Sequence, residues 1–355
     1  MSNLSVMPNM LGIDVSKNKL DCTLLEAMTR KALWQCQVPN TTQGITQLLD
    51  RLDRLPTSDS LASPVSLVLE PTGRYSRAIA QRAHADGKTV LLAPPRRAHA
   101  FLQSVQSRAK TDTLDSRSLA LFALSQPLRP YPIKSDAVEK VDQLLSARKG
   151  ISSALTRLQM QRKELPHAAQ ALDAALLALK TQKAVLDKQI AARVGQEPSL
   201  SPTATRLQQV PGIGPITAAA VTARLADKQF LHPDSFVSYI GLDVAVRQSG
   251  QKSGNLGLTH QGDAELRRLF YLAAQSNLRS KDPDNPFKLQ YERERAKGLS
   301  TTAALCAVAR KLAKLCWSLH KHQSEYDPAR VAQQGGRRPK QSQGELKDAP
   351  QSSTP

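Results

Sequence analysis

The sequence predicts a mixed α/β sheet with helices packed against it, followed by a mostly helical region. Two observations support this prediction. Up to about residue 133, short apolar runs alternate with amphipathic stretches, as strands and helices do when helices cover a sheet. From residue 136 the strand-like runs stop, and apolar residues recur three and four positions apart. With 355 residues, the chain is long enough for two globular domains and a connection.

Three strands are expected to open the first domain, which we place at residues 9–133; they are MLGIDVS, KLDCTLLEA and ALWQCQVPN. A Thr-capped helix follows in TTQGITQLLDRL. Next come a buried strand in SPVSLVLE, a helix in GRYSRAIAQRAHADGK that ends at Gly87, and a strand in TVLLAP that two prolines close. The last helices are RRAHAFLQSVQS and TLDSRSLALFALS. This order fits an RNase H-like domain, although the pattern alone also allows other α/β sheets.

Residues 136–195 are expected to be a helical, coiled-coil connection that Pro166 breaks into two helices. The second helix carries an apolar seam with one polar position, Lys183, in phase with it. The apolar members of the seam are Leu172, Leu176, Leu179, Leu186 and Ile190. Such a seam suits a coiled coil between two chains, and it equally suits a helical hairpin within one chain.

Residues 200–325 are expected to form a second, mostly helical domain. It begins with a Gly-rich turn between two short helices, in which Gly212 and Gly214 can present backbone N–H groups to a phosphate. The turn resembles a helix-hairpin-helix element, and such turns also serve tight packing. A basic amphipathic helix with Arg267 and Arg268 is a second candidate for nucleic-acid binding. Residues 328–355 are polar and basic, and we expect a disordered tail.

The bulk properties favour a nucleic-acid partner. The formal net charge of +19 attracts polyanions such as DNA, RNA or an anionic membrane. No apolar run approaches the roughly 20 residues of a membrane-spanning helix. No export signal is visible, and the four cysteines suggest neither zinc nor a disulfide framework, so we expect a cytoplasmic protein. Because aromatic residues make up only 4% of the chain, contacts with the phosphate backbone should outweigh base stacking.

Four acidic residues have the pattern of a two-metal phosphoryl-transfer site: Asp14, Glu70, Asp112 and Asp115. The first two interrupt or end predicted strands, and the last two lie three apart at the start of a predicted helix. Carboxylates gathered in this way repel one another unless cations lie among them, and all-oxygen sites suit Mg²⁺ or Mn²⁺. The alternative is structural: Asp14 would pair with a nearby cation, and Asp112 would cap the helix with Asp115 in its first turn.

A Gly-rich loop offers two hydroxyl groups as candidate nucleophiles. Ser249 and Ser253 each precede a glycine, which allows close approach of the backbone to a substrate. From the local sequence alone, an ordinary turn is the better interpretation.

Taken together, these motifs resemble the DEDD transposases, an insertion-sequence family that also includes the Piv-type DNA invertases. The resemblance covers roughly residues 10–325 and rests on six segments in the family's order: GIDVSKNKLD, LEPTGRY, KTDTLDSRSLA, VPGIGPITAAAV, YIGLDVAVRQSG and GDAELRRLFYLAA. It implies a RuvC-like N-terminal domain with an RNase H fold, a coiled-coil connection and a C-terminal transposase domain.

The resemblance also implies roles for single residues. It assigns Asp14, Glu70, Asp112 and Asp115 to a metal-binding tetrad and Ser249 to a catalytic serine. The implied reaction cleaves and re-joins DNA strands through a covalent phosphoserine, so donor and target duplex DNA are the implied substrates. The family further implies a guiding noncoding RNA and assembly as a dimer or a pair of dimers. In a bacterial cytoplasm, such a protein would associate with the nucleoid when bound to DNA.

Two departures from the family pattern lie near the serine. Val244 stands where a proline is usual, and Thr259 with His260 replaces the usual Ser-Lys before Gly262. Two other functions remain open: a RuvC-like junction nuclease that uses water as its nucleophile, and a non-catalytic DNA-binding protein. The sequence does not distinguish transposition from inversion.

Overall fold

The computed structural model describes residues 7–55, 64–71, 73–105, 115–249, 252–259 and 261–334. The chain divides into two compact units, Met1–Lys134 and Ser135–Pro355, which are described separately. Asp112 lies outside the described residues, so the structure says nothing of its position.

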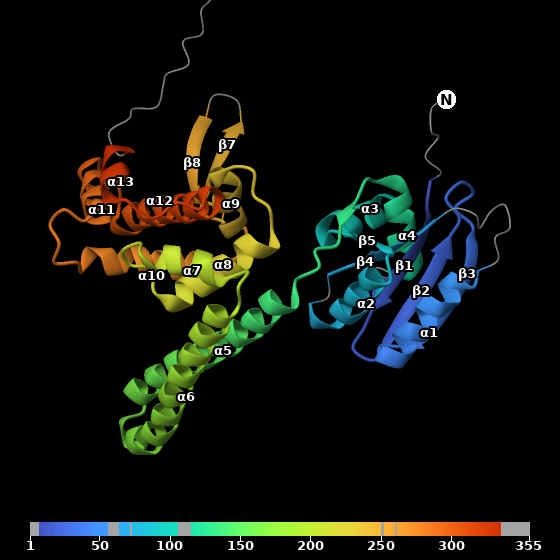
Figure 1. The fold of residues 1–355 in the computed structure, drawn as a ribbon, viewed down its shortest axis with the longest axis horizontal. Coiled ribbons are helices and arrows are strands. Elements are labelled where there is room, and N and C mark those ends of the chain that lie inside the picture. The colour runs from blue at the N-terminus through green and yellow to red at the C-terminus, as the bar shows by residue number, and fades with distance from the viewer. Residues whose placement is uncertain are drawn as a thin grey trace, which may run out of the picture. The chain divides into compact units, whose positions relative to one another are not determined.

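The first unit is built on a six-stranded mixed sheet with the strand order β3-β2-β1-β4-β5-β6 (Figure 1). Its strands are β1 (Asn9–Val15), β2 (Lys19–Leu25), β3 (Ala32–Pro39), β4 (Val65–Leu69), β5 (Thr89–Leu92) and β6 (Arg129–Pro130). The first three strands are antiparallel, as short turns between them require, whereas β4 runs parallel to both β1 and β5. The sheet is therefore mixed, as the sequence predicts.

Helices cover both faces of this sheet. α1 (Thr42–Asp53) and α2 (Arg74–Ala85) pack against the face that carries Leu11, Ile13 and Val15. α3 (Pro95–Val105) and α4 (Ser116–Ser125) pack on the face that carries Met10. The alternation along β1 follows from the two-residue period of a strand.

Gly12 brings α4 into direct contact with β1. A Cβ atom at this position would lie 1.9 Å from the Ser116 backbone oxygen and 2.7 Å from the Ala120 backbone nitrogen. Only a residue without a side chain allows the helix backbone to approach so closely. The start of α4 is thereby held against the middle of the sheet.

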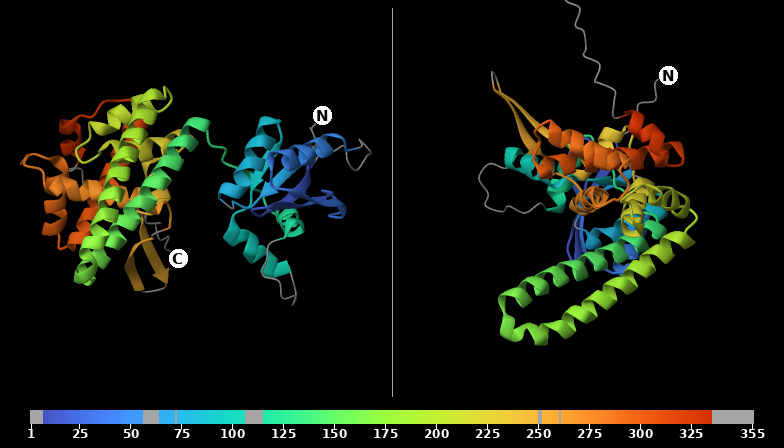
Figure 2. Two further views of the ribbon diagram at one scale, coloured as in Figure 1. Left: turned by 90° about the horizontal axis from the view of Figure 1, so that it is seen from below. Right: turned by 90° about the vertical axis from the view of Figure 1, so that its left-hand side faces the viewer.

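The second unit begins with a long helical hairpin, seen at the base of this unit in Figure 1 and projecting from it in Figure 2. α5 (Asp136–Glu164) and α6 (Ala169–Gln196) are joined by a 3-10 turn, Pro166–Ala168, so the predicted break at Pro166 is confirmed. Leu176 and Ile190 of the predicted seam are buried, and Arg148 of α5 forms an ion pair with Asp187 of α6. The seam packs within the chain, which favours the intramolecular hairpin over the intermolecular coiled coil.

The rest of the second unit is a helical bundle around the buried helix α12 (Thr301–His322). The surrounding helices are α7 (Ser201–Gln208), α8 (Pro215–Asp227), α9 (Pro233–Ile240), α10 (Ala264–Leu278), α11 (Pro286–Ala296) and α13 (Pro328–Gln334). The expected tail at 328–355 thus begins in a helix, because Val331 is buried in the bundle core. No helix among the described residues combines the length and apolarity needed to cross a bilayer.

A two-stranded hairpin, β7 (Val244–Ser249) and β8 (Lys252–Leu258), interrupts the helices of the second unit and was not predicted from the sequence. The two strands extend away from the bundle in Figures 1 and 2. Gly254, Gly257 and several polar residues weaken the apolar alternation that usually identifies a strand.

Candidate active site

Two of the predicted carboxylates follow adjacent parallel strands on one edge of the sheet. β1 and β4 pair up to Ile13 and Leu69, so Asp14 and Glu70 are the next residues along each strand. The alternation of the strands places both on the face that α4 covers, because Met10 and Val68 belong to the core beneath that helix. Both residues are partly buried.

A third carboxylate, Asp21, belongs to the same cluster and was missed from the sequence. Asp21 of β2 is the cross-strand partner of Asp14, and directly opposed residues have Cβ atoms about 4.5–5.5 Å apart. Its side chain accepts from Gln37 Nε2 at 2.5 Å and lies 3.0 Å from Lys19 Nζ. The sequence could have revealed it, because a short turn between the first two strands fixes their register and so places Asp21 opposite Asp14.

Asp115 reaches this face of the sheet from α4. It is the N-cap of the helix, and its Oδ1 accepts from the Ser118 backbone N–H at 2.7 Å. The helix start is anchored by a 2.8 Å hydrogen bond between the hydroxyl groups of Ser116 and Thr23. The sequence alternative assigned the cap to Asp112 and the first turn to Asp115, and the structure corrects it: Asp115 itself caps α4.

Burial and the neighbouring carboxylates together raise the pKa of Asp14. Burial is the largest cause, and the carboxylates of Asp21 and Asp115 add to it, whereas the Lys19 ammonium acts in the opposite direction. Lys19 is one such nearby cation, and it forms its ion pair with Asp21. The surroundings of Asp14 therefore disfavour its charged form.

A divalent cation fits these residues. The donors are carboxylate oxygens, which hard cations prefer, and a cation would relieve the repulsion that raises the pKa of Asp14. Among the described ranges, which leave out Asp112, no three acidic, cysteine or histidine side chains are close enough to hold one ion together. The described part of the cluster therefore supplies some, and not all, of the ligands of such a site.

The predicted nucleophile lies in the second unit. Ser249 ends β7 opposite Lys252, and Ser253 of β8 pairs with Gln248. Ser249 is thus the last residue of β7. At the base of the hairpin, Thr259 donates from Oγ1 to Asp243 Oδ1 at 2.5 Å. One of the two departures from the family pattern therefore makes a hydrogen bond that fixes the base of the hairpin.

The glycines of the predicted phosphate-binding turn have different surroundings. Gly212 has φ +85°, and a Cβ there would lie 2.4 Å from Asn277 Nδ2 and 2.6 Å from the Ala273 backbone oxygen. It therefore allows the turn to pack against α10. Gly214 is exposed at the start of α8, with open space around it.

The two predicted arginines make contacts within the protein. Arg267 donates from an Nη atom to the Ile240 backbone oxygen at 2.9 Å and so satisfies the end of α9. Arg268 pairs with Glu265 one turn earlier on α10 and remains exposed. Of the two, Arg268 is the one whose side chain remains open to solvent.

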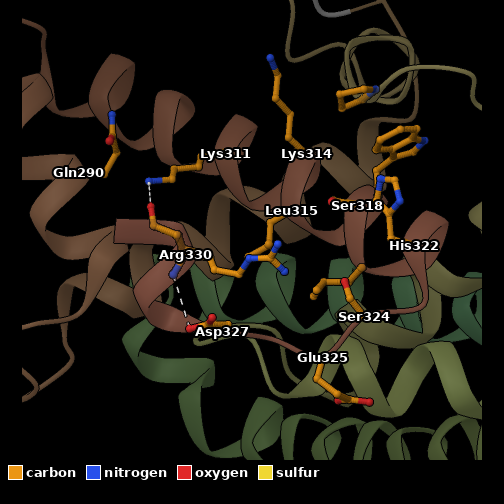
Figure 3. A pocket seen from close by; sticks show the side chains of 14 residues that line it. Gln290, Lys311, Lys314, Leu315, Ser318, His322, Ser324, Glu325, Asp327 and Arg330 are labelled. Carbon is orange, nitrogen blue, oxygen red and sulfur yellow. Dashed lines mark hydrogen bonds between the residues drawn. The ribbon is translucent and has the colours of Figure 1, made fainter. Parts of the chain in front are cut away.

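A hollow of about 830 Å³ lies elsewhere in the second unit, where α13 covers α12 (Figure 3). Lys311 donates there to the Val331 backbone oxygen at 3.2 Å, and burial followed by Arg293 lowers its pKa. None of the predicted catalytic or nucleic-acid-binding residues lines this space. It therefore adds nothing to the candidate active site.

The chain is similar to known transposases and to a gene-inverting protein. One family, described as a transposase of the DEDD type, matches residues 11–165, and a second, described as "Transposase IS116/IS110/IS902 family", matches residues 204–292. A pilin gene-inverting protein of Moraxella bovis is 26% identical over 323 residues, which cover 89% of this chain and 97% of that protein.

Two insertion-element proteins are also similar. An uncharacterized 42 kDa protein of the insertion element IS900 from Mycobacterium paratuberculosis is 28% identical, over 78% of this chain and 69% of its own length. The transposase for insertion sequence element IS1328 of Yersinia enterocolitica is 31% identical over 116 residues, which are 32% of this chain and 35% of that protein.

Proposed function

We propose that this chain, which belongs to the DEDD and IS116/IS110/IS902 transposase families, cleaves DNA strands and re-joins them through a covalent serine intermediate. The observation that carries the proposal is the carboxylate cluster on the α4 face of the sheet, where Asp14 has a raised pKa beside Asp21 and Asp115. An acidic cluster of this kind supports phosphoryl transfer better than binding of a polyanion alone.

In this proposal, Asp14, Glu70, Asp112 and Asp115 hold Mg²⁺ or Mn²⁺, with Asp21 beside them. A bound divalent ion supplies positive charge to the phosphate oxygens and to the attacking and leaving oxygens. The protein's own contribution is positional. The strand register presents Asp14 and Glu70 together, and Gly12 allows α4 to bring Asp115 to the same face.

We assign the nucleophile to Ser249. Its Oγ attacks a DNA phosphorus atom and forms a phosphoserine bond, while one P–O bond of the strand breaks and the leaving hydroxyl takes up a proton. Attack on that phosphoserine by a second strand's hydroxyl reverses the exchange and releases the serine. Ser249 is the last residue of β7, and its correspondence to the catalytic serine that the family resemblance implies supports this role.

Further features of the proposal follow from the family and the fold. The strand order β3-β2-β1-β4-β5 supports an RNase H-like, RuvC-like first unit, and the short turn between α7 and α8 supports a helix-hairpin-helix element. We propose duplex DNA as donor and target, a guiding noncoding RNA, and a dimer or pair of dimers. The place of action would be the bacterial cytoplasm, at the nucleoid.

The test is a DNA substrate that traps the covalent intermediate. A duplex with a nick beside the cleavage site is incubated with the protein, Mg²⁺ and the RNA transcribed from the flanking DNA. A denaturing gel should show a protein–DNA adduct, and peptide mapping should place the link at Ser249. Ser249→Ala should abolish the adduct, and Asp14→Asn should abolish cleavage.

Two results would contradict the assignment. An adduct that persists in Ser249→Ala would move the nucleophile to Ser253 or to another hydroxyl. Efficient Mg²⁺-dependent cleavage without any adduct would favour the water-using nuclease.

A further inference from the structure

A second hollow, of about 630 Å³, lies in the second unit where the α5–α6 hairpin meets α8 and α10. Four cationic side chains line it: Arg148, Lys180, Lys183 and Arg268. Asp187 is the only acidic residue among its lining residues. The hollow is therefore a concentration of positive charge even within a chain that is basic throughout.

Among the described residues, acidic side chains offset only part of this charge, and Arg268 is already paired with Glu265. Asp187 pairs with Arg148 and lies 3.8 Å from Lys183 Nζ, so one carboxylate serves two cations. Lys180 forms no ion pair with any residue that the structure describes. Gathered like charges repel one another, and this arrangement is stabilised when an anion enters.

The first turn of α8 and Ser152 of α5 also border the hollow. Ile216 and Thr217, in the first turn of α8, line the hollow, and no side chain caps this helix at Gly214. The positive end of the 13-residue helix is thus open to an anion. Ser152 of α5 lines the same space, and its buried Oγ has no hydrogen-bond partner within the described part of the chain.

We propose that this hollow binds the phosphodiester backbone of a nucleic acid. Cations on two opposing walls suit a run of several phosphates better than one small anion, because they are spread over three helices. No aromatic side chain lines the hollow, so bases have nothing to stack on and recognition is independent of sequence. The ligand class rests on the proposed function, whereas the binding residues follow from the hollow itself.

The test measures equilibrium binding of the full chain in EDTA, so that strand cleavage plays no part. Two fluorescent probes of random sequence are used separately, a DNA duplex and an RNA hairpin. Lys180→Gln with Lys183→Gln should weaken binding of at least one probe by about tenfold and lower the salt-dependence slope by about 2, since each phosphate contact contributes about 0.9. The affected probe identifies the nucleic acid.

The matched control is Lys149→Gln with Lys188→Gln. These exposed lysines lie on α5 and α6, outside the hollow, and their removal takes away the same charge from the same hairpin. The control should weaken binding by less than about threefold. Arg268→Gln tests the side of the hollow that α10 forms. If the double lysine variant has a lowered melting temperature, Lys180→Gln alone, a change at an exposed side chain, replaces it.

Equal losses in the hollow and control variants would overturn the proposal, because the charge would then act only through the overall field. Unchanged affinity in all hollow variants would overturn it too. These outcomes differ from a failure of the proposed function, in which the wild-type protein itself would bind neither probe.

Discussion

At the scale of single residues, Asp14 and Asp21 are neighbours with opposite electrostatic situations. Burial and the other carboxylates raise the pKa of Asp14. Burial would also raise the pKa of Asp21, but hydrogen bonds from Gln37 and Lys19 outweigh it, and the pKa is lowered. The folded protein therefore disfavours the charge on Asp14 and favours the charge on Asp21.

Replacing Asp14 by Asn should raise the melting temperature of the metal-free protein at pH 7 by about 1–3 °C. The charge that it removes is disfavoured in the fold. This gain should shrink as the pH falls through the raised pKa of Asp14, because the wild-type carboxyl then becomes neutral as well. Addition of Mg²⁺ or Mn²⁺ should stabilise the wild type more than the variant. Scanning calorimetry with and without EDTA measures both effects.

Asp21→Asn is the control, since it loses the Lys19 ion pair and should lower the melting temperature slightly. Shifts of the same sign in both variants would refute this account of the cluster.

The cysteines offer a second prediction at this scale. Cys22 and Cys36 are cross-strand partners on β2 and β3. A hydrogen bond from Cys22 lowers the pKa of Cys36 against the effect of burial, and the Arg51 guanidinium adds to the lowering. Iodoacetamide at pH 7 should therefore modify Cys36 before Cys306 or the buried Cys316, as mass spectrometry can follow. Arg51→Gln should slow this reaction, and faster labelling of Cys306 would show the assignment to be mistaken.

At the scale of elements, the contact between β1 and α4 determines the geometry of the cluster. Gly12 lets the helix backbone touch the strand, and the helix start carries Asp115. Because Gly12 has no side chain, α4 lies close to β1, and this sets the distance of the Asp115 carboxylate from the sheet.

Gly12→Ala should lower the free energy of unfolding of the first unit by about 2–3 kcal/mol, because the new Cβ meets backbone atoms that no rotamer change can move. DNA cleavage should fall with it, since α4 must shift. The control is Gly150→Ala, in α5, where a Cβ meets nothing within 4 Å. It should stabilise the protein by about 0.5–1 kcal/mol. Urea unfolding measures both, and a neutral Gly12→Ala would disprove the close contact.

The sequence predicts the helices and strands better than it predicts which residues of different elements lie side by side. Periodicity and turn residues identify β1 to β5 and the break at Pro166, whereas the short edge strand β6 was not predicted. The β7–β8 hairpin escapes this reasoning because its glycines and polar residues carry little periodicity. Asp14 and Glu70 are predictable at strand ends, whereas the place of Asp21 beside Asp14 depends on a register that periodicity does not contain. The cap at Asp115 likewise depends on where α4 begins.

At the scale of the whole molecule, each unit has its own apolar core, and a partly buried ion triad also connects helices of the second unit. Arg224 of α8 pairs with Asp142 of α5 and with Asp263, the N-cap of α10, at 2.9 Å. Burial alone would raise the pKa of Asp263, but backbone N–H donors and Arg224 together lower it. One guanidinium thus links the helical hairpin to two helices of the bundle.

Arg224→Met should destabilise the second unit by about 3 kcal/mol, since it leaves two carboxylates without their cation. The lowered pKa of Asp263 contributes stability above its unfolded value of 3.8, and this contribution is lost as the pH falls through the folded pKa. Asp263→Asn should therefore be destabilising at pH 7, and this effect should be smaller near pH 3, because the stabilising contribution is lost as the pH falls through the folded pKa. Urea titrations followed by tryptophan fluorescence measure this dependence, and an equal effect at both values would exclude the charged role of Asp263.

The triad also gives the hairpin a mechanical property. From Asp142 to its end at Glu164, α5 rises by 22 residue steps (164 − 142), or about 33 Å at 1.5 Å per residue. A rotation of α5 by about 10° at the Arg224–Asp142 ion pair would move the far end of the helix by about 6 Å. This is nearly two base steps along a DNA strand. A small rotation at this ion pair would thus displace the tip of the hairpin by a distance comparable to the nucleotide repeat.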